Sequence, residues 1–231
     1  MTYRLRPCWV LLLTVLLASS AAAGPPLICH PFDIGAAKSL PWQGPAWSAV
    51  DPGYRIDHLA DDTLAVLTPQ APVLVRMETL RRATVYARND PRSAAQLLAR
   101  LRDRTASTAK GSHDYALALF DAGYLTETYK EAAWISATAH EAFWKFQQPN
   151  PTEDGYAQLT RAIALSGDPA MEFAAAVVAS DRRTYDVSAE RQHLTRALAG
   201  APEGSLLGRN LVAHFGQDEL RAVRLAAEKT R

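Results

Sequence analysis

The chain has 231 residues, and its 25 lysines and arginines against 24 acidic residues give a formal net charge of +1. The cationic residues form no continuous stripe, which argues against electrostatic binding to nucleic acid or to anionic lipid. The length suits one domain with a substantial core, or two small ones.

Residues 1–23 have the three zones of a secretory signal peptide. Arg4 and Arg6 give a positive start, residues 9–17 form an apolar run, and Ala21-Ala22-Ala23 fits the A-x-A cleavage pattern. The run is shorter than the roughly 20 apolar residues that a bilayer span requires. We therefore expect cleavage near Ala23, export to the periplasm or the cell exterior, and no stable membrane span afterwards. An uncleaved N-terminal anchor is the alternative.

Cleavage would change both the charge and the cysteine content. It removes Arg4, Arg6 and no acid, so 23 basic and 24 acidic residues remain and the net charge becomes −1. It also removes Cys8, which leaves Cys29 as the one cysteine and makes an intramolecular disulfide impossible. A lone cysteine in an exported protein is buried and inert, paired with another chain, or functional. Burial is the commonest of these fates.

Residues 24–53 are expected to form an extended segment that is rich in proline and tryptophan. Between Gly24 and Asp51, five prolines remove backbone donors and oppose helix formation: Pro25, Pro26, Pro31, Pro41 and Pro45. The same stretch carries apolar side chains at Leu27, Ile28, Phe32, Ile34, Leu40, Trp42 and Trp47. A disordered linker would not hold this much apolar surface, so the segment is expected to pack on the rest of the protein.

Residues 54–231 are expected to form an all-α domain. Apolar residues recur at intervals of three and four, as on one face of a helix, for example at Val73, Met77 and Leu80. Strand-like alternation is not sustained, and alanine, the best helix former, is abundant. Asp90-Pro91 and Asp168-Pro169 each place an N-cap aspartate before a proline suited to the first helical position.

The lengths of these helical pieces and of the turns between them indicate antiparallel helix hairpins. Residues 116–124 (ALALFDAGY) resemble the small-residue and tyrosine pattern of a tetratricopeptide (TPR) repeat, although the roughly 34-residue period is not regular. The favoured architecture is a degenerate, TPR-like α-solenoid. A compact irregular helical bundle follows from the same local pattern and is the alternative.

Cys29 and His30 are the candidates for ligand chemistry. A c-type haem site requires Cys-x-x-Cys-His, and Pro26 stands where the first cysteine would be. The other histidines lack the spacing of two ligands on one helix. If Cys29 were a nucleophile, His30 would be poorly placed to act as its base, because successive side chains of an extended segment point to opposite faces. Asp33 could orient His30. A buried cysteine beside a hydrogen-bonded histidine is the simpler interpretation, and we assign no catalytic residue, metal site or cofactor.

Two groups of charged residues have the spacing of surface pairs. Glu78 beside Arg81 and Arg82 has the pattern of an ordinary charged helix face. Glu127 and Glu131 are four residues apart, and we expect them on a solvated helix face.

Residues 27–42 (LICHPFDIGAAKSLPW) resemble the N-terminal signature of a group of uncharacterised bacterial secreted proteins. Two further blocks, residues 76–83 (RMETLRRA) and 167–176 (GDPAMEFAAA), agree with the same group, so the likeness spans most of the mature chain. The resemblance implies that the Cys-His-Pro segment is a defining feature of the group. It supplies no mechanism, but it indicates a candidate binding site at Cys29, His30, Asp33, Lys38 and Trp42.

Two functional hypotheses follow. The first is an exported helical-repeat protein that serves as a scaffold for another exported protein or a peptide. The alternative is a protein that binds a small molecule, a metal or haem through Cys29 and His30. An enzyme of unknown class is a third possibility, for which no motif has the required spacing.

Overall fold

The computed structural model describes residues 27–138, 152–181, 183 and 185–229. The predicted signal peptide, residues 1–23, lies outside this part of the chain. Within the described residues all regular secondary structure is helical and no strand is present, which confirms the predicted all-α class. None of the helices in the described residues combines the length and the apolarity needed to cross a membrane.

The helices follow one another with short connections. In chain order they are the 3₁₀ turn η1 (Ile56–His58), α1 (Leu59–Val66), α2 (Val73–Ala87), α3 (Pro91–Ser107), α4 (His113–Thr138), α5 (Gly155–Ser166), α6 (Pro169–Ala179), α7 (Val187–Ala199), α8 (Leu206–Phe215) and α9 (Gln217–Lys229).

The two helix starts predicted at Asp-Pro pairs are confirmed. The Asp90 and Asp168 side chains each accept a hydrogen bond from a backbone N–H two or three residues ahead, at 2.9 and 2.8 Å. Pro91 and Pro169 are the first residues of α3 and α6. Each carboxylate satisfies a backbone donor that the helix leaves free and lies at the positive end of the helix dipole. Local sequence therefore determines where both helices begin.

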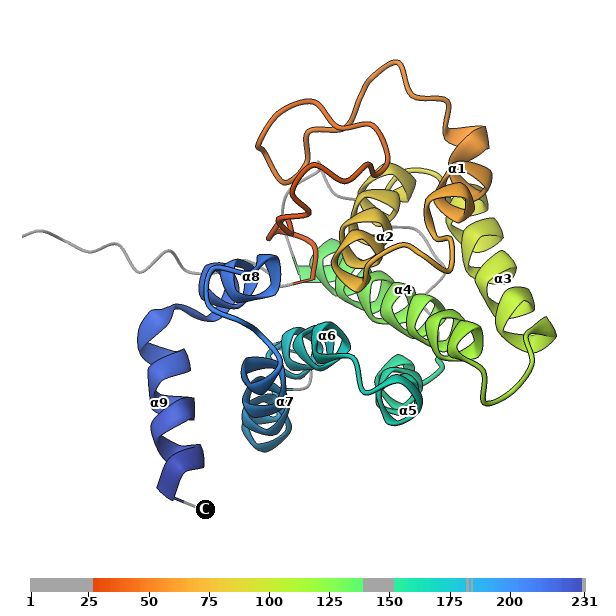
Figure 1. Cartoon of the computed structure of the whole chain (residues 1–231). Coiled ribbons are helices and arrows are strands. Elements are labelled where there is room, and N and C mark those ends of the chain that lie inside the picture. The colour runs from red at the N-terminus through yellow and green to blue at the C-terminus, as the bar shows by residue number, and fades with distance from the viewer. Residues whose placement is uncertain (1–26, 139–151, 182, 184, 230–231) are drawn as a thin grey trace, which may run out of the picture.

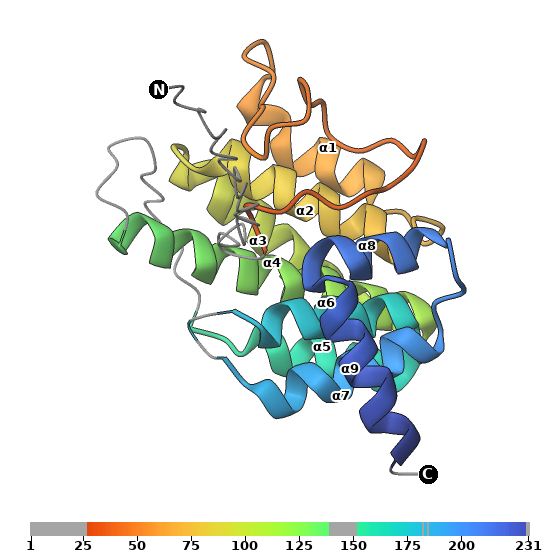
Figure 2. The ribbon, with the colours of Figure 1, turned by 90° about the vertical axis from the view of Figure 1, so that its left-hand side faces the viewer.

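Helix α4 is the axis around which the other helices are arranged (Figure 1). It packs against α2 and α3 on one side and against α5 and α6 on the other, and Figure 2 shows the same order in a view turned by 90°. Residues 115–129 of α4 are all buried, so the helix is covered around its whole circumference. Its polar side chains must therefore find partners inside the protein.

These polar side chains correct one expectation. Glu127 and Glu131 do not lie on a solvated face, because they are 4% and 0% exposed. Glu127 Oε1 lies 2.8 Å from Lys130 Nζ, and Glu131 Oε1 accepts a hydrogen bond of 3.2 Å from the Leu27 N–H. Spacing along one helix could not reveal this burial, because other helices and the N-terminal segment cause it.

Residues 27–55, which precede the first helix, contain turns and bends. Leu27, Ile28, Phe32 and Leu40 are at most 4% exposed, so this stretch packs on the helices, as its apolar content predicts. Its path, red to orange in Figure 1, crosses α2 and reaches α8. We call residues 27–50 the N-terminal strap.

Candidate functional site

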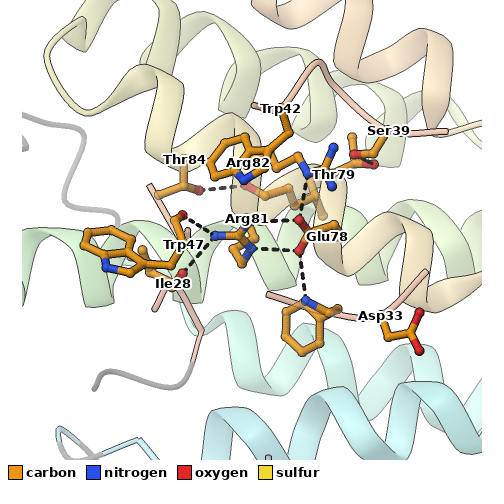
Figure 3. Close-up of polar contacts among 12 residues, drawn as sticks. Ile28, Asp33, Ser39, Trp42, Trp47, Glu78, Thr79, Arg81, Arg82 and Thr84 are labelled. Carbon is orange, nitrogen blue, oxygen red and sulfur yellow. Dashed lines mark hydrogen bonds and ion pairs between the residues drawn. The ribbon is translucent and has the colours of Figure 1, made fainter. Parts of the chain in front are cut away.

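A buried carboxylate on α2 is the main anchor of the N-terminal strap (Figure 3). Glu78 Oε2 accepts hydrogen bonds from Arg81 Nε at 2.7 Å and from the Phe32 N–H at 3.0 Å. Glu78 Oε1 accepts from Arg81 Nη2 at 2.8 Å and from Arg82 Nε at 2.7 Å. Burial alone would raise the pKa of Glu78, but the hydrogen bonds and charges of these partners hold it below its usual value.

The same two arginines also bind the backbone of the strap. Arg81 Nη1 donates to the carbonyls of Ile28 at 3.0 Å and of Trp47 at 2.8 Å, and Arg82 Nη1 donates to the carbonyl of Leu40 at 2.6 Å. The strap has no regular secondary structure, so its buried carbonyls need other donors. Charged guanidinium groups are strong donors for this purpose.

This cluster shows that the interpretation of Glu78, Arg81 and Arg82 as an ordinary charged helix face was wrong. Glu78 is 1% exposed and Arg81 is 0% exposed. Their i, i+3 and i, i+4 spacing is that of a surface pair. The strap, however, covers them from a distant part of the sequence: Ile28 and Trp47, which bind Arg81, are 53 and 34 positions away from it.

Phe32 occupies the junction of four helices. Its N–H donates to Glu78 of α2, and its ring stacks on His214 of α8, with centroids 4.7 Å apart and an interplanar angle of 5°. The ring also meets Phe173 of α6 and Tyr124 of α4 edge-on, at 6.0 and 6.5 Å. Burial lowers the pKa of His214 to about 4, so its ring is neutral at pH 7 and stacks as an apolar partner.

Cys29 and His30 precede Phe32, and both are half-buried. Burial, reinforced by the Glu131 carboxylate and opposed by Arg81, raises the pKa of the Cys29 thiol to about 12. Cys29 is therefore a thiol at neutral pH, whereas nucleophilic catalysis requires the thiolate. The His30 ring lies 5.7 Å from the ring of His214. Across the described residues, no group of three or more His, Cys, Asp or Glu side chains is placed to hold a metal ion.

Asp33 and Lys38 lie further along the strap. The Asp33 N–H donates to Asn210 Oδ1 at 2.9 Å, and the Asp33 carbonyl accepts from Asn210 Nδ2 at 2.8 Å. The Asp33 carboxylate accepts a hydrogen bond from the Gly35 N–H and pairs with Arg209 Nε at 2.9 Å, and these contacts lower its pKa. Asp33 thus ties the strap to α8, whereas Lys38 is exposed.

Trp42 covers the other end of the α2 cluster. Its indole N–H donates to the Ala46 carbonyl at 3.0 Å, and its ring lies 4.9 and 5.3 Å from the guanidinium carbons of Arg81 and Arg82. Tyr86 meets it edge-on at 6.0 Å. The five residues of the predicted site thus have different surroundings. His30 and Asp33 contact α8, and Trp42 covers arginines of α2. Lys38 is exposed, and Cys29 is half-buried. The structure does not gather their side chains around one point, and their common effect is to attach the strap to the helices.

A hydrogen-bonded chain that sequence reasoning missed joins three helices. Tyr156 Oη of α5 lies 2.7 Å from His193 Nε2 of α7, and His193 Nδ1 hydrogen-bonds Glu172 Oε2 of α6. Phenol, imidazole and carboxylate in this order resemble a nucleophilic relay. His193 and Glu172 are only 4% and 6% exposed, however, so the chain bridges the helices within the core. The two hydrogen-bonded pairs are 37 and 21 positions apart in the sequence, and no local spacing signals their contact.

A groove runs along the contact between α7 and α9, with a volume of about 420 Å³. We call it the α7–α9 groove, and it is lined by Arg191, Gln192, Thr195, Glu219, Ala222 and Val223. A smaller hollow of about 200 Å³ extends it toward Leu198 and Arg224. The sequence contained no signal for this groove, because its two walls come from helices that only the fold brings together.

No protein-family model, curated protein or solved structure matches this chain. The resemblance to uncharacterised secreted proteins therefore stays a prediction from the three sequence blocks.

Proposed function

We propose that this chain is an exported helical-repeat protein, related to the group of bacterial secreted proteins that it resembles, and that it binds another exported protein or a peptide. The arrangement that we propose is a TPR-like array in which consecutive helices form hairpins. The direct packing of α3 on α4, of α4 on α5 and of α6 on α7 supports it. The surface that we assign to binding is the α7–α9 groove.

The observation that carries this assignment is how little of α9 is buried. Leu220 and Val223 are its buried side chains, whereas Ala222 and Ala226, which line the groove, are exposed. Figure 1 shows α9 at the edge of the molecule, next to α7. Exposed apolar side chains beside a groove are the usual mark of a binding surface.

The shape of the groove favours a helix as its occupant. Its walls are two helices, and α9, with 13 residues, is about 20 Å long. Small side chains such as Thr195 and Ala222 line it and allow close approach of a partner backbone. A helix with apolar residues every three to four positions would fit this surface. Arg191 and Glu219, which are exposed, also line the groove, so the partner is expected to carry charges of both signs.

A photo-crosslinking amino acid at Ala222 tests the proposal in cells that export the protein. Ala99, which is exposed on α3, is the matched control position. We expect one adduct of defined mass from position 222 and none from position 99. The captured protein is then purified, and its affinity is measured for the unmodified chain, for Ala222→Glu and for Ala99→Glu.

The proposal requires that Ala222→Glu weakens binding by about tenfold or more while Ala99→Glu has little effect, because the new carboxylate would be desolvated in the groove. Equal affinities of the two variants would exclude the α7–α9 groove as the binding surface. Export is tested separately by mass spectrometry of the chain from the producing cell. A mature N-terminus at Gly24 is expected, and retention of residues 1–23 would contradict it.

A further inference from the structure

A second cleft, of about 360 Å³, lies between α3, α4 and α5, on the part of the molecule farther from α9 in Figure 1. Of the described residues that line it, Arg102, Lys110 and Arg161 are cationic and none is acidic. They come from α3, from the turn between α3 and α4, and from α5, so the fold brings together charges that are separated in sequence.

Two of these cations have no carboxylate partner among the residues that the structure describes. Arg102 Nη2 pairs with Glu153 Oε1 at 2.6 Å, in a contact of which each side chain is more than two-fifths exposed. Within the described part of the chain, no acidic oxygen lies within 4 Å of the Lys110 or Arg161 side-chain nitrogens. Like charges around one cleft repel one another, and an anion bound between them would remove this repulsion.

The floor of the cleft is apolar. Tyr115 and Leu119 are each 5% exposed, and Ala122 is 2% exposed. The Arg161 guanidinium lies 5.6 Å from the centroid of the Tyr115 ring, which holds it over the floor by a cation–π contact. An arginine positioned in this way presents its planar fork to a carboxylate or a phosphate.

One residue that lines the cleft, Gln158, carries an acceptor that lacks a donor. Gln158 Oε1 is buried, and no hydrogen-bond partner for it is present among the described residues. Leaving a buried acceptor without a donor is costly, and a ligand hydroxyl or N–H group would satisfy it.

We propose that this cleft is a binding site for a small organic anion that has an apolar body and a hydrogen-bond donor. The anionic group pairs with Lys110 and Arg161, the apolar body covers Leu119 and Ala122, and the donor meets Gln158. The volume lies near the lower end of the range of small-molecule sites, which limits the ligand to a compact molecule. This proposal does not depend on the α7–α9 groove.

Mandelate is a suitable probe, because it combines a phenyl ring, a carboxylate and a hydroxyl group. Phenylacetate lacks the hydroxyl, and mandelamide lacks the charge. Calorimetric titration of the purified protein is expected to show saturable mandelate binding with a Kd of about 1 mM or lower. Phenylacetate should bind about tenfold more weakly, because Gln158 then stays without a donor. Mandelamide should show no saturation.

Variants test the residues directly. Arg161→Gln and Lys110→Gln should each weaken mandelate binding by about tenfold, whereas Arg191→Gln, an equal charge change at the α7–α9 groove, should leave it unaltered. Circular dichroism confirms that each variant is folded. The proposal is overturned if mandelate fails to saturate the protein up to about 20 mM, if mandelamide binds as tightly, or if all three variants bind like the unmodified chain.

Discussion

Replacing Glu78 by glutamine tests whether the N-terminal strap is held by charge. The substitution keeps the shape of the side chain but removes its negative charge and turns one acceptor oxygen into an N–H donor. That donor would face guanidinium groups that are themselves donors. Arg81, which is 0% exposed, would then be a buried cation without its counter-charge.

The magnitude follows from the contacts that are lost. Glu78 accepts four hydrogen bonds, two at each oxygen, and the amide can keep those at one oxygen. Hydrogen bonds to charged groups contribute about 1.5–3 kcal/mol each, so two lost bonds amount to about 3–6 kcal/mol. Removing one partner of a buried ion pair costs about 3–5 kcal/mol in other proteins, in agreement with this range.

Urea unfolding followed by circular dichroism measures the change, with Glu153→Gln as the matched control. Glu153 pairs with Arg102 in a largely exposed contact, so its loss should cost less than about 1 kcal/mol. Release of the strap should also speed tryptic cleavage after the exposed Lys38. If Glu78→Gln destabilises the protein no more than the control does, the reasoning on the buried cluster is wrong.

Three further predictions rest on other buried groups. Burial, with the nearby Asp181 carboxylate, raises the pKa of Glu131 to about 8, so its contribution to stability is full below pH 4.5 and is lost as the pH rises toward 8. We therefore expect the unmodified chain to lose stability relative to Glu131→Gln as the pH rises from 5 to 8. The difference in the free energy of unfolding should change by up to about 1.4 kcal/mol per pH unit, as measured by thermal unfolding. Cys29, with its raised pKa, should react with iodoacetamide at pH 8 at least about tenfold more slowly in the folded protein than in the unfolded one, as measured by mass spectrometry. Gly123→Ala should destabilise the fold by about 1–3 kcal/mol in urea unfolding. Its Cβ would lie 2.7 Å from the Gly155 carbonyl oxygen, where α4 and α5 approach closely.

Each of these predictions has a defined contrary outcome. A constant stability difference between the unmodified chain and Glu131→Gln across this pH range would show that Glu131 does not titrate there. Equal alkylation rates in the folded and unfolded protein would show that burial does not protect Cys29. The control for Gly123→Ala is Gly53→Ala. Gly53 lies in an exposed turn, where the nearest atom to an added Cβ is a side-chain oxygen 3.4 Å away. Equal effects of the two alanines would refute the close-approach argument.

The sequence predicted those features of the fold that short stretches of chain determine. Asp90 and Asp168 cap their helices through atoms two or three residues away, so a short sequence contains all that is needed. The apolar side chains at Leu27 and Phe32 indicated that the N-terminal segment would pack, because exposing them to water is unfavourable whatever covers them.

Features that depend on distant partners could not be predicted. Glu131 has the spacing of a surface residue, and the group that it accepts a hydrogen bond from, Leu27, is 104 positions away. Helix α4 is buried without interruption from residue 115 to residue 129. This range includes acidic residues that the sequence periodicity assigns to a solvated face. The candidate site was affected in the same way. Cys29, Asp33 and Trp42 follow one another in one segment, but each contacts a different set of partners that the fold supplies.

The contacts of the N-terminal strap with α8 determine when the fold can be completed during synthesis. Asp33 leaves the ribosome 177 positions ahead of Asn210, the residue that binds its backbone. Until α8 follows, Phe32 has no His214 ring to stack on and the junction of four helices stays open. Contacts of such sequence separation form slowly and late. If the chain is exported unfolded, as we propose, this late closure keeps its N-terminal part free of the α8 contacts while the rest is still being made.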